Sequence, residues 1–101
     1  MSGDLAERDE AVMPAASIER EIRSFLGETF PLAGDAGSVP ADGSLIELGV
    51  IDSTGVLEVV GFIESRFGFE VPVDEIAPEY LDTIDSITAY VGERLREVGG
   101  D

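Results

Sequence analysis

The sequence predicts an all-α fold, a small four-helix bundle made of three longer amphipathic helices and one short helix. Three stretches of the chain place apolar residues at the 3.6-residue spacing of a helix, and no stretch shows a sustained strand pattern. A length of 101 residues allows one domain. We expect a flexible tail over residues 1–15, the helical domain over residues 16–98 and a short tail over residues 99–101.

The first expected helix covers residues 17–29. Ser17 is the expected N-cap, and Glu19 and Glu21 would then lie in the first turn, where the helix dipole favours acidic side chains. Pro31 prevents the helix from continuing far beyond its end. The apolar stripe of this helix consists of Ile18, Ile22, Phe25 and Leu26.

A long loop is expected over residues 31–44, which are rich in glycine and proline. Loops of this length usually carry function or need anchors in the core. The apolar residues that follow the loop are the expected anchors, and they are Leu45, Ile46, Leu48, Val50 and Ile51.

The second expected helix covers residues 53–67, with Asp52 or Ser53 as its cap and Gly68 as its stop. Its apolar residues fall within an arc of about 100° and form the expected core face. These residues are Val56, Val59, Val60, Ile63 and Phe67. The opposite face carries Thr54, Glu58, Gly61 and Ser65, with Leu57 and Phe62 on the flanks.

The last third of the chain predicts an extended segment and two helices. Residues 71–73 are expected to be extended, and residues 74–81 to hold only a short helix that Pro78 breaks. The last helix covers residues 83–98, with Asp82 or Thr83 as its cap. Its apolar stripe consists of Ile84, Ile87, Val91, Leu95 and Val98.

The composition excludes most kinds of chemistry. The chain has no His, Cys, Trp or Lys, and its six basic residues are all Arg. It therefore lacks a Ser–His or Cys–His pair, a Schiff-base lysine and the usual ligands of zinc. We expect no catalytic residues and no metal site.

The net charge of −16 bears on possible partners. A chain this acidic repels the phosphate backbone of nucleic acids and anionic membrane surfaces. No apolar run approaches the roughly 18 residues of a membrane span, and the N-terminus lacks the apolar core of a signal peptide. We expect a cytoplasmic monomer that does not span a membrane.

The most informative local pattern is Gly-Val-Ile-Asp-Ser-Thr-Gly over residues 49–55. A serine at a helix start has an exposed hydroxyl, and the helix N-terminus would stabilise a phosphate attached to it. A simpler interpretation is that Asp52 and Ser53 only cap the helix. The Asp-Thr/Ser-Gly element of aspartic proteases does not match, because an extra residue separates Ser53 from Gly55. The acidic residues also lack the spacing of an EF-hand loop.

The segment from Ser17 to Val98 resembles the acyl carrier protein family, which includes free-standing peptidyl and aminoacyl carriers. The Asp52-Ser53 pair at the start of the second helix carries this resemblance, and Phe67-Gly68 and Val71-Pro72 match the family's passage toward its third helix. The resemblance implies that Ser53 carries a 4′-phosphopantetheine arm, with Asp52 as its acidic neighbour. It also implies partners, namely a phosphopantetheinyl transferase and either an adenylating ligase or synthase enzymes with basic docking surfaces.

Several residues depart from the pattern of fatty-acid carriers. Two residues separate Gly49 from Asp52, Thr54 and Gly55 stand where those carriers have an apolar residue and an acid, and Arg66 replaces a later acid. The run resembles D-alanyl carrier proteins more closely, so the cargo is expected to be an amino acid or a short acyl group. An adenylating enzyme would load it.

The sequence therefore predicts a carrier that is not itself an enzyme and that holds its cargo as a thioester on the arm. The residues expected to contact partners lie on the second helix and are Thr54, Leu57, Glu58, Gly61 and Glu64. A core that could part to shelter cargo would consist of Leu48, Val59, Ile63, Ile76, Tyr80 and Leu81. The alternative is an acidic helical interaction domain that has no covalent group.

Overall fold

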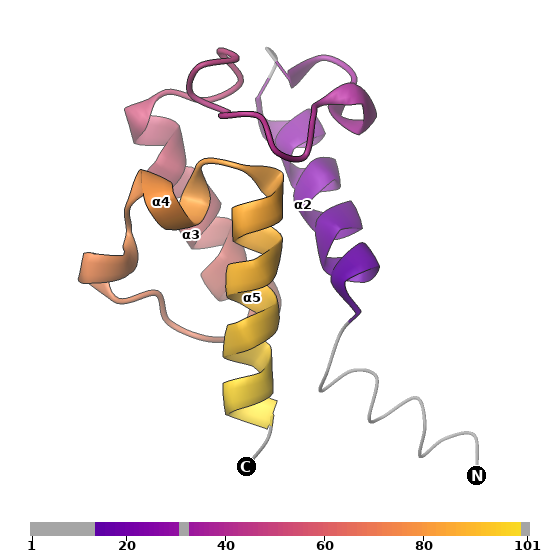
Figure 1. Ribbon diagram of the computed structural model, residues 1–101. Coiled ribbons are helices and arrows are strands. Elements are labelled where there is room, and N and C mark those ends of the chain that lie inside the picture. Colours follow the sequence, from indigo (N-terminus) through magenta and orange to yellow (C-terminus); the bar gives the residue numbers. More distant parts are fainter. Residues whose placement is uncertain (1–13, 31–32, 100–101) are drawn as a thin grey trace, which may run out of the picture.

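The computed structural model describes residues 14–30 and 33–99, and these residues form helices joined by loops (Figure 1). The described part contains no strand, so the predicted all-α bundle is confirmed. The three longer helices are α2 (Ala15–Thr29), α3 (Ser53–Phe67) and α5 (Ile84–Gly99), and the short one is α4 (Pro78–Leu81). Two single turns of 3₁₀ helix are η2 (Ala36–Ser38) and η3 (Val73–Glu75). The expected tail falls almost entirely on residues 1–13, which lie outside the described residues.

Helix α2 begins earlier than the sequence suggested. Its N-cap is Pro14, whose carbonyl oxygen accepts from the Ser17 and Ile18 N–H groups at 3.0 and 3.1 Å. The prediction that Ser17 caps the helix is wrong, and Glu19 and Glu21 consequently lie beyond the first turn. Pro14 is extended, with φ at −62° and ψ at 150°, and the helix begins directly after it without a side-chain cap.

The core lies between α2, α3 and α5, and its side chains come from the predicted stripes. The side chains that are at most 1% exposed include Ile18, Ile22, Leu26, Leu45, Val59, Ile63, Leu81, Ile84, Ile87 and Val91. Two expected core residues are exposed, since Leu48 is 51% and Tyr80 is 37% exposed, and a third, Ile76, is half-buried. Leu48 lies in the turn before Gly49 and Tyr80 lies in α4, and both side chains face outward. The apolar character of these residues in the sequence does not indicate this orientation.

Prolines and a threonine cap begin the helical segments between residues 72 and 84. Pro72 is extended, but Val73 already begins η3. Pro78 begins α4 as its first residue and does not break it, because a proline at that position gives up no helical hydrogen bond. Of the two predicted caps of α5, Thr83 is the one used, since its Oγ1 accepts from the Ser86 N–H at 2.9 Å.

The predicted long loop is fixed to the bundle by Leu45 and Asp82. The Leu45 side chain is fully buried, and its N–H donates to the carbonyl oxygen of Asp82 at 2.7 Å. The Asp82 carboxylate accepts from the Ser44 hydroxyl and from the Ile46 N–H. Val50 and Ile51 are also buried, whereas Ile46 is 37% exposed. Three of the five expected anchors are therefore buried.

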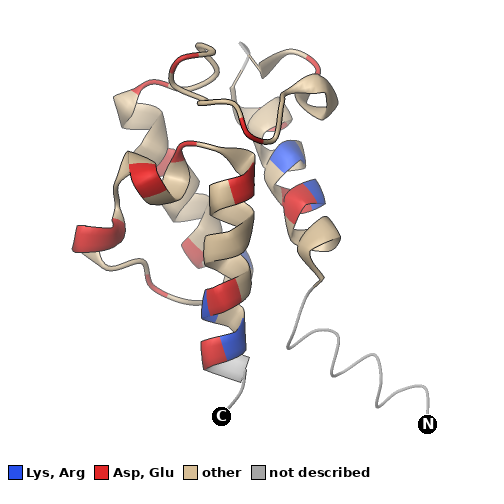
Figure 2. Ribbon diagram, in the orientation of Figure 1, with Lys and Arg blue, Asp and Glu red and all other residues tan. Residues whose placement is uncertain are grey.

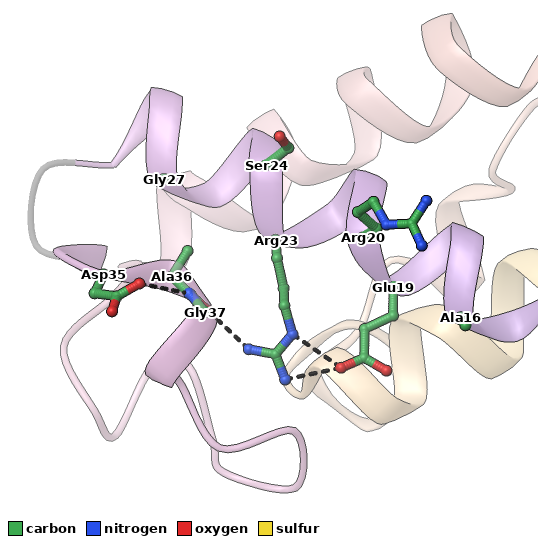
Figure 3. A pocket seen from close by; sticks show the side chains of 9 residues that line it. All are labelled: Ala16, Glu19, Arg20, Arg23, Ser24, Gly27, Asp35, Ala36 and Gly37. Atoms are coloured by element: carbon green, nitrogen blue, oxygen red, sulfur yellow. Dashed lines mark hydrogen bonds and ion pairs between the residues drawn. The ribbon is translucent and has the colours of Figure 1, made fainter.

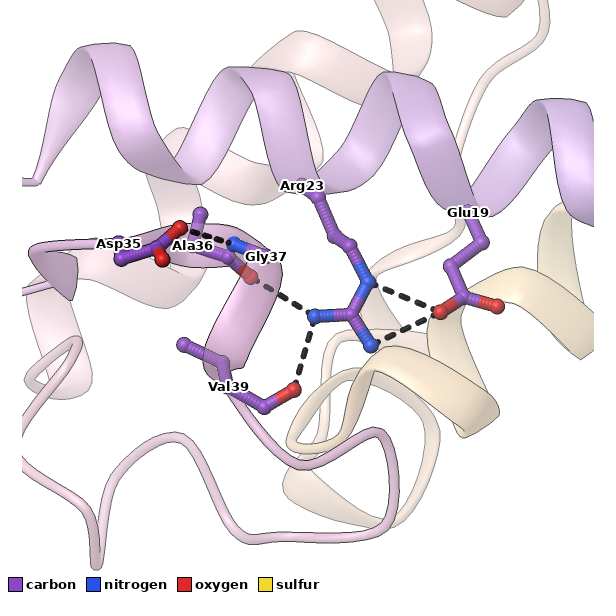
Figure 4. A network of polar contacts seen from close by, with 6 residues as sticks. All are labelled: Glu19, Arg23, Asp35, Ala36, Gly37 and Val39. Carbon is purple, nitrogen blue, oxygen red and sulfur yellow. Dashed lines mark hydrogen bonds and ion pairs between the residues drawn. The ribbon is translucent and has the colours of Figure 1, made fainter.

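Arg23 of α2 holds the first half of the same loop (Figures 3 and 4). Its Nη1 donates to the carbonyl oxygens of Ala36 and Val39 at 2.7 and 2.8 Å. Its other nitrogens contact Glu19 at 2.8 and 2.9 Å, which fixes the guanidinium group. Figure 3 shows that the neighbouring Arg20 points away from this network. A single arginine thus satisfies two carbonyl groups of residues that are themselves buried.

We expect Arg23→Met to lower the free energy of unfolding by about 1–3 kcal/mol, because two partly buried carbonyl groups lose their donor. The methionine keeps most of the aliphatic stem, so packing changes little. The matched control is Arg20→Met on the exposed side of α2, which should stay within about 0.5 kcal/mol of the parent. Urea unfolding followed by circular dichroism measures both. Equal unfolding midpoints for the two variants would contradict this role of Arg23.

Charged residues are distributed unevenly over the bundle (Figure 2). The charged residues of α4 and η3 are all acidic, whereas α2 and α5 carry both signs. Arg66 of α3 forms two hydrogen bonds with Glu21 of α2, at 2.8 and 3.0 Å, and these bonds lower the pKa of the Glu21 carboxyl. The late basic residue in α3 therefore connects two helices. None of the helices in the described part is both long and apolar enough to cross a membrane.

Candidate functional site

Ser53 lies at the surface as the first residue of α3, held there by its neighbour Asp52. Asp52 is the N-cap, and its Oδ1 accepts from the Gly55 N–H at 2.8 Å. This hydrogen bond turns the carboxylate back toward the helix and satisfies one of the free N–H groups of the first turn. The Ser53 side chain is exposed. Of the two predicted caps, Asp52 performs the capping and leaves the Ser53 hydroxyl available.

The apolar residues before Ser53 set its position. Gly49 adopts a positive φ of 79°, which reverses the chain after the loop. The carbonyl oxygen of Leu45 then accepts from the N–H groups of Val50 and Ile51 at 2.9 and 3.3 Å. Both of these side chains are buried. This tight turn joins the buried residue Leu45 to the start of α3. Ser53 therefore follows directly on a turn that is packed into the core.

The close packing of this turn against α3 favours glycine at position 55. A Cβ atom at Gly55 would lie 3.0 Å from the Cβ of Ile51 and 3.1 Å from the ring of Phe30. Glycine therefore allows the end of α2 to rest on the first turn of α3. The sequence showed Gly55 only as a departure from fatty-acid carriers. The structure gives a physical reason, since any larger side chain at this position would press on Phe30 and Ile51.

A surface groove opens beside Ser53, between the first turns of α3 and the segment that precedes it. We call it the α3 groove, and its volume is about 640 Å³. The residues that line it are Phe30, Ile46, Gly49, Val50, Ile51, Asp52, Ser53, Thr54 and Glu58. Its apolar wall comes from the end of α2 and from the loop, and its polar wall comes from α3. Ser53 itself belongs to the lining.

The five residues expected to contact partners fall on two neighbouring strips of α3. Thr54, Glu58 and Gly61 follow the helical repeat along one strip and are all exposed. Leu57 and Glu64 lie on the other strip, and Leu57 is a large apolar side chain that is 59% exposed. The structure thus brings the exposed residues onto the surface that begins at Ser53.

Glu64 has an additional structural role. Its Oε2 accepts from the Val71 N–H at 2.9 Å, which holds the segment that follows α3. Gly68 ends the helix in the left-handed conformation with φ at 80°, as predicted. Glu64 is half-buried because of this contact. Its expected part in partner binding stays a prediction.

The acidic residues of η3 are also partly occupied within the fold. Glu75 accepts from the Tyr90 hydroxyl at 2.6 Å, and Arg94 approaches the same Glu75 oxygen to 3.5 Å. Burial and the neighbouring carboxylate raise the pKa of Tyr90. The sequence gave no sign of this contact, because residues 75 and 90 belong to different elements. In the described ranges, no three acidic side chains lie close enough together to hold a metal ion.

The chemistry available to this site is limited. In the described part of the chain, no hydrogen bond joins the Ser53 hydroxyl to a carboxylate that would act as a base. The carboxylate of the preceding residue, Asp52, accepts from the Gly55 N–H. Ser53 is therefore an exposed hydroxyl to which, among the described residues, no carboxylate is hydrogen-bonded.

Comparison with known proteins identifies relatives of this chain. Residues 18–91 match the family model described as "Phosphopantetheine attachment site". The D-alanyl carrier protein of Streptococcus suis is 40% identical over 54 residues, which cover 54% of this chain and 68% of that protein. The anthracycline acyl carrier protein DauA of Streptomyces sp. (strain C5) is 36% identical over 87 residues, covering 85% and 95%. The anthracycline acyl carrier protein DpsG of Streptomyces peucetius matches to the same extent. No solved structure matches the chain.

Proposed function

Because the chain belongs to the phosphopantetheine-attachment family of carrier proteins, we propose that Ser53 is the residue that carries its 4′-phosphopantetheine arm. Proteins of this family are carriers and not enzymes, and they hold an acyl or aminoacyl group on the covalently bound arm. When bound, the arm supplies a terminal thiol, which holds the cargo as a thioester.

The observation that carries this proposal is the position of Ser53. Its side chain is exposed at the first residue of a 15-residue helix, and Asp52 fixes the turn without blocking the hydroxyl. The N-terminus of a helix favours a negatively charged phosphate. Gly55 allows the first turn to pack closely on Phe30 and Ile51, which supports the attachment point from below. The residues present therefore fit the group.

Intact mass spectrometry tests the attachment site. The full-length chain is incubated with coenzyme A and a broad-specificity phosphopantetheinyl transferase, beside a carrier protein known to be modified. We expect an added mass of one phosphopantetheine, and fragmentation should place it on the peptide that contains Ser53. Added mass on another serine would contradict Ser53. No added mass, while the control is modified, would support the alternative of an acidic interaction domain.

We further propose that partner enzymes dock on the exposed strips of α3. Thr54, Glu58 and Gly61 offer small and acidic contacts, and Leu57 offers an exposed apolar one. An enzyme with a basic surface and an apolar pocket would complement this arrangement. The phosphopantetheinyl transferase is one such partner, and an adenylating ligase or synthase enzyme is another. Because coenzyme A supplies the arm, we place the protein in the cytoplasm.

The rate of modification should fall with increasing salt. Raising the ionic strength from about 0.01 M to about 1 M shortens the Debye length from about 30 Å to about 3 Å and screens the attraction of the acidic chain to a basic partner. We expect kcat/KM of the transferase for this protein to fall several-fold. Glu58→Gln should weaken the salt dependence more than Glu93→Gln, which removes the same charge at an exposed position of α5. A rate that is independent of salt would contradict electrostatic docking.

The relatives divide over the class of cargo. One named relative is a D-alanyl carrier and two are acyl carriers for anthracyclines. We propose that the cargo is an amino acid or a short acyl group, loaded by a separate adenylating enzyme. The resemblance around Ser53 supports an amino acid, and the longer match to the anthracycline acyl carrier proteins supports an acyl group.

A further inference from the structure

We propose that the arm attached to Ser53 rests in the α3 groove, against Phe30 and Ile46, and does not enter the core between the helices. This inference depends on the proposed attachment at Ser53. It assigns the groove a ligand of mixed chemistry, a chain with geminal methyl groups and amide and hydroxyl groups. The groove then keeps the arm on the α2 side of α3.

The position of Ser53 is the first argument. Ser53 lines the groove, so a group attached to its hydroxyl begins at the groove and needs no path through the protein. The volume of about 640 Å³ lies within the range of about 300–1,000 Å³ that small-molecule sites occupy. A tethered ligand also samples a nearby surface at high effective concentration, so weak contacts are enough to hold it.

The apolar wall of the groove is the second argument. Ile46 is 37% exposed although most apolar side chains of this loop are buried. Its backbone is fixed, because its N–H donates to the Asp82 carboxylate at 3.1 Å. Phe30 is half-buried and is held by an edge contact with Phe25 at 5.8 Å between ring centres. The wall is therefore prepared before a ligand arrives, which reduces the entropy lost on binding.

The polar wall is the third argument. Thr54 and Glu58 lie one helical turn apart along the other side of the groove, and both are exposed. The Thr54 hydroxyl both donates and accepts, and the Glu58 carboxylate accepts. The amide N–H and hydroxyl groups of the arm are suitable donors for these oxygens. The two walls therefore match the two kinds of group along the arm.

The core offers a poorer place for the arm. Val59, Ile63 and Leu81 are 0–1% exposed, so the arm could enter only by separating side chains that are already in contact. Such an opening loses the dispersion contacts of a densely packed interior. The groove requires no such rearrangement.

Nuclear magnetic resonance of the isotope-labelled full chain, before and after modification, tests the inference. Intact mass first establishes that the arm is attached, so a failure of the proposed attachment is recognised at this step. We expect NOEs between the methyl groups of the arm and the Ile46 methyl groups or the Phe30 ring. The Ile46 methyl signals should shift several-fold more than those of Leu48, an exposed residue of the same segment outside the groove lining.

Two variants complete the test. Ile46→Ala should weaken the NOEs to the remaining groove residues, whereas Leu48→Ala should leave them unchanged. NOEs from the arm of the modified protein to Val59, Ile63 or Leu81 would overturn the inference in favour of the core. A modified protein with no NOEs from the arm to the chain would overturn it as well, because the arm would then be free in solvent.

Discussion

Replacing Ser53 with alanine should abolish the attachment of 4′-phosphopantetheine and leave the fold intact. The phosphodiester bond needs the Ser53 oxygen, and alanine has none. Helix α3 should persist, because Asp52 supplies the N-terminal cap and Gly68 the C-terminal one. Alanine is also a better helix former than serine. We expect complete loss of the added mass. This effect is larger than the several-fold change in the rate of modification that is expected when docking is weakened.

The control must separate loss of the hydroxyl from loss of structure. Ser65→Ala makes the same chemical change at an exposed position further along α3, and this variant should be modified like the parent. Circular dichroism should show the same helix content for both variants and the parent. If Ser53→Ala still gained the mass of one phosphopantetheine, the attachment site would lie elsewhere. In that case the exposed Ser53 hydroxyl would have no part in the attachment.

The helix that carries the site is the element that sequence reasoning predicted best. Both ends of α3 agree with the prediction, because each end is decided by residues within a few positions. Asp52 bonds to Gly55, three residues on, and Gly68 supplies the left-handed conformation that ends the helix. Such local chemistry can be predicted from a sequence. The same reasoning identified Ser53 as the exposed residue next to the cap.

The omissions concern contacts between distant parts of the chain, whereas the misplaced cap of α2 and the role of Pro78 are local errors. Arg23 bonds to carbonyl groups 13 and 16 residues away, and Glu64 bonds to the N–H of the loop beyond its helix. The periodic spacing of apolar residues in the sequence does not predict such contacts. The fit of Gly55 beside Phe30 also depends on where α2 ends in space. The structure therefore adds the parts of the site that depend on packing, and the α3 groove is one of them.

The structure also distinguishes acidic residues that are paired within the fold from an acidic residue that is exposed beside the groove. Glu19, Glu21 and Glu75 pair with arginines or with a tyrosine hydroxyl, so these carboxylates serve the fold. Glu58 is exposed beside the groove. Asp52 and Glu58 are the acidic residues that line the groove, so a single substitution at Glu58 is expected to change the salt dependence.

The largest expected effect on stability follows from replacing Leu45 with alanine. The Leu45 side chain is fully buried, and truncating such a leucine costs about 2–5 kcal/mol. Domains of this size have a total free energy of unfolding of only about 5–15 kcal/mol. We therefore expect the melting temperature to fall by about 10 °C or more. The backbone carbonyl oxygen of Leu45 accepts from the Val50 and Ile51 N–H groups, so a backbone shift around the truncated side chain should loosen the turn before Ser53 and slow its modification.

The same segment provides the control for this prediction. Leu48→Ala removes the same atoms three residues away, but Leu48 is 51% exposed, so the free energy of unfolding should change by at most about 0.5–1 kcal/mol. The pair differs mainly in burial, and differential scanning calorimetry measures both. Equal melting temperatures would mean that Leu45 does not anchor the loop. A stable Leu45→Ala variant that is modified at the parent rate would likewise show that Ser53 is positioned by α3 alone.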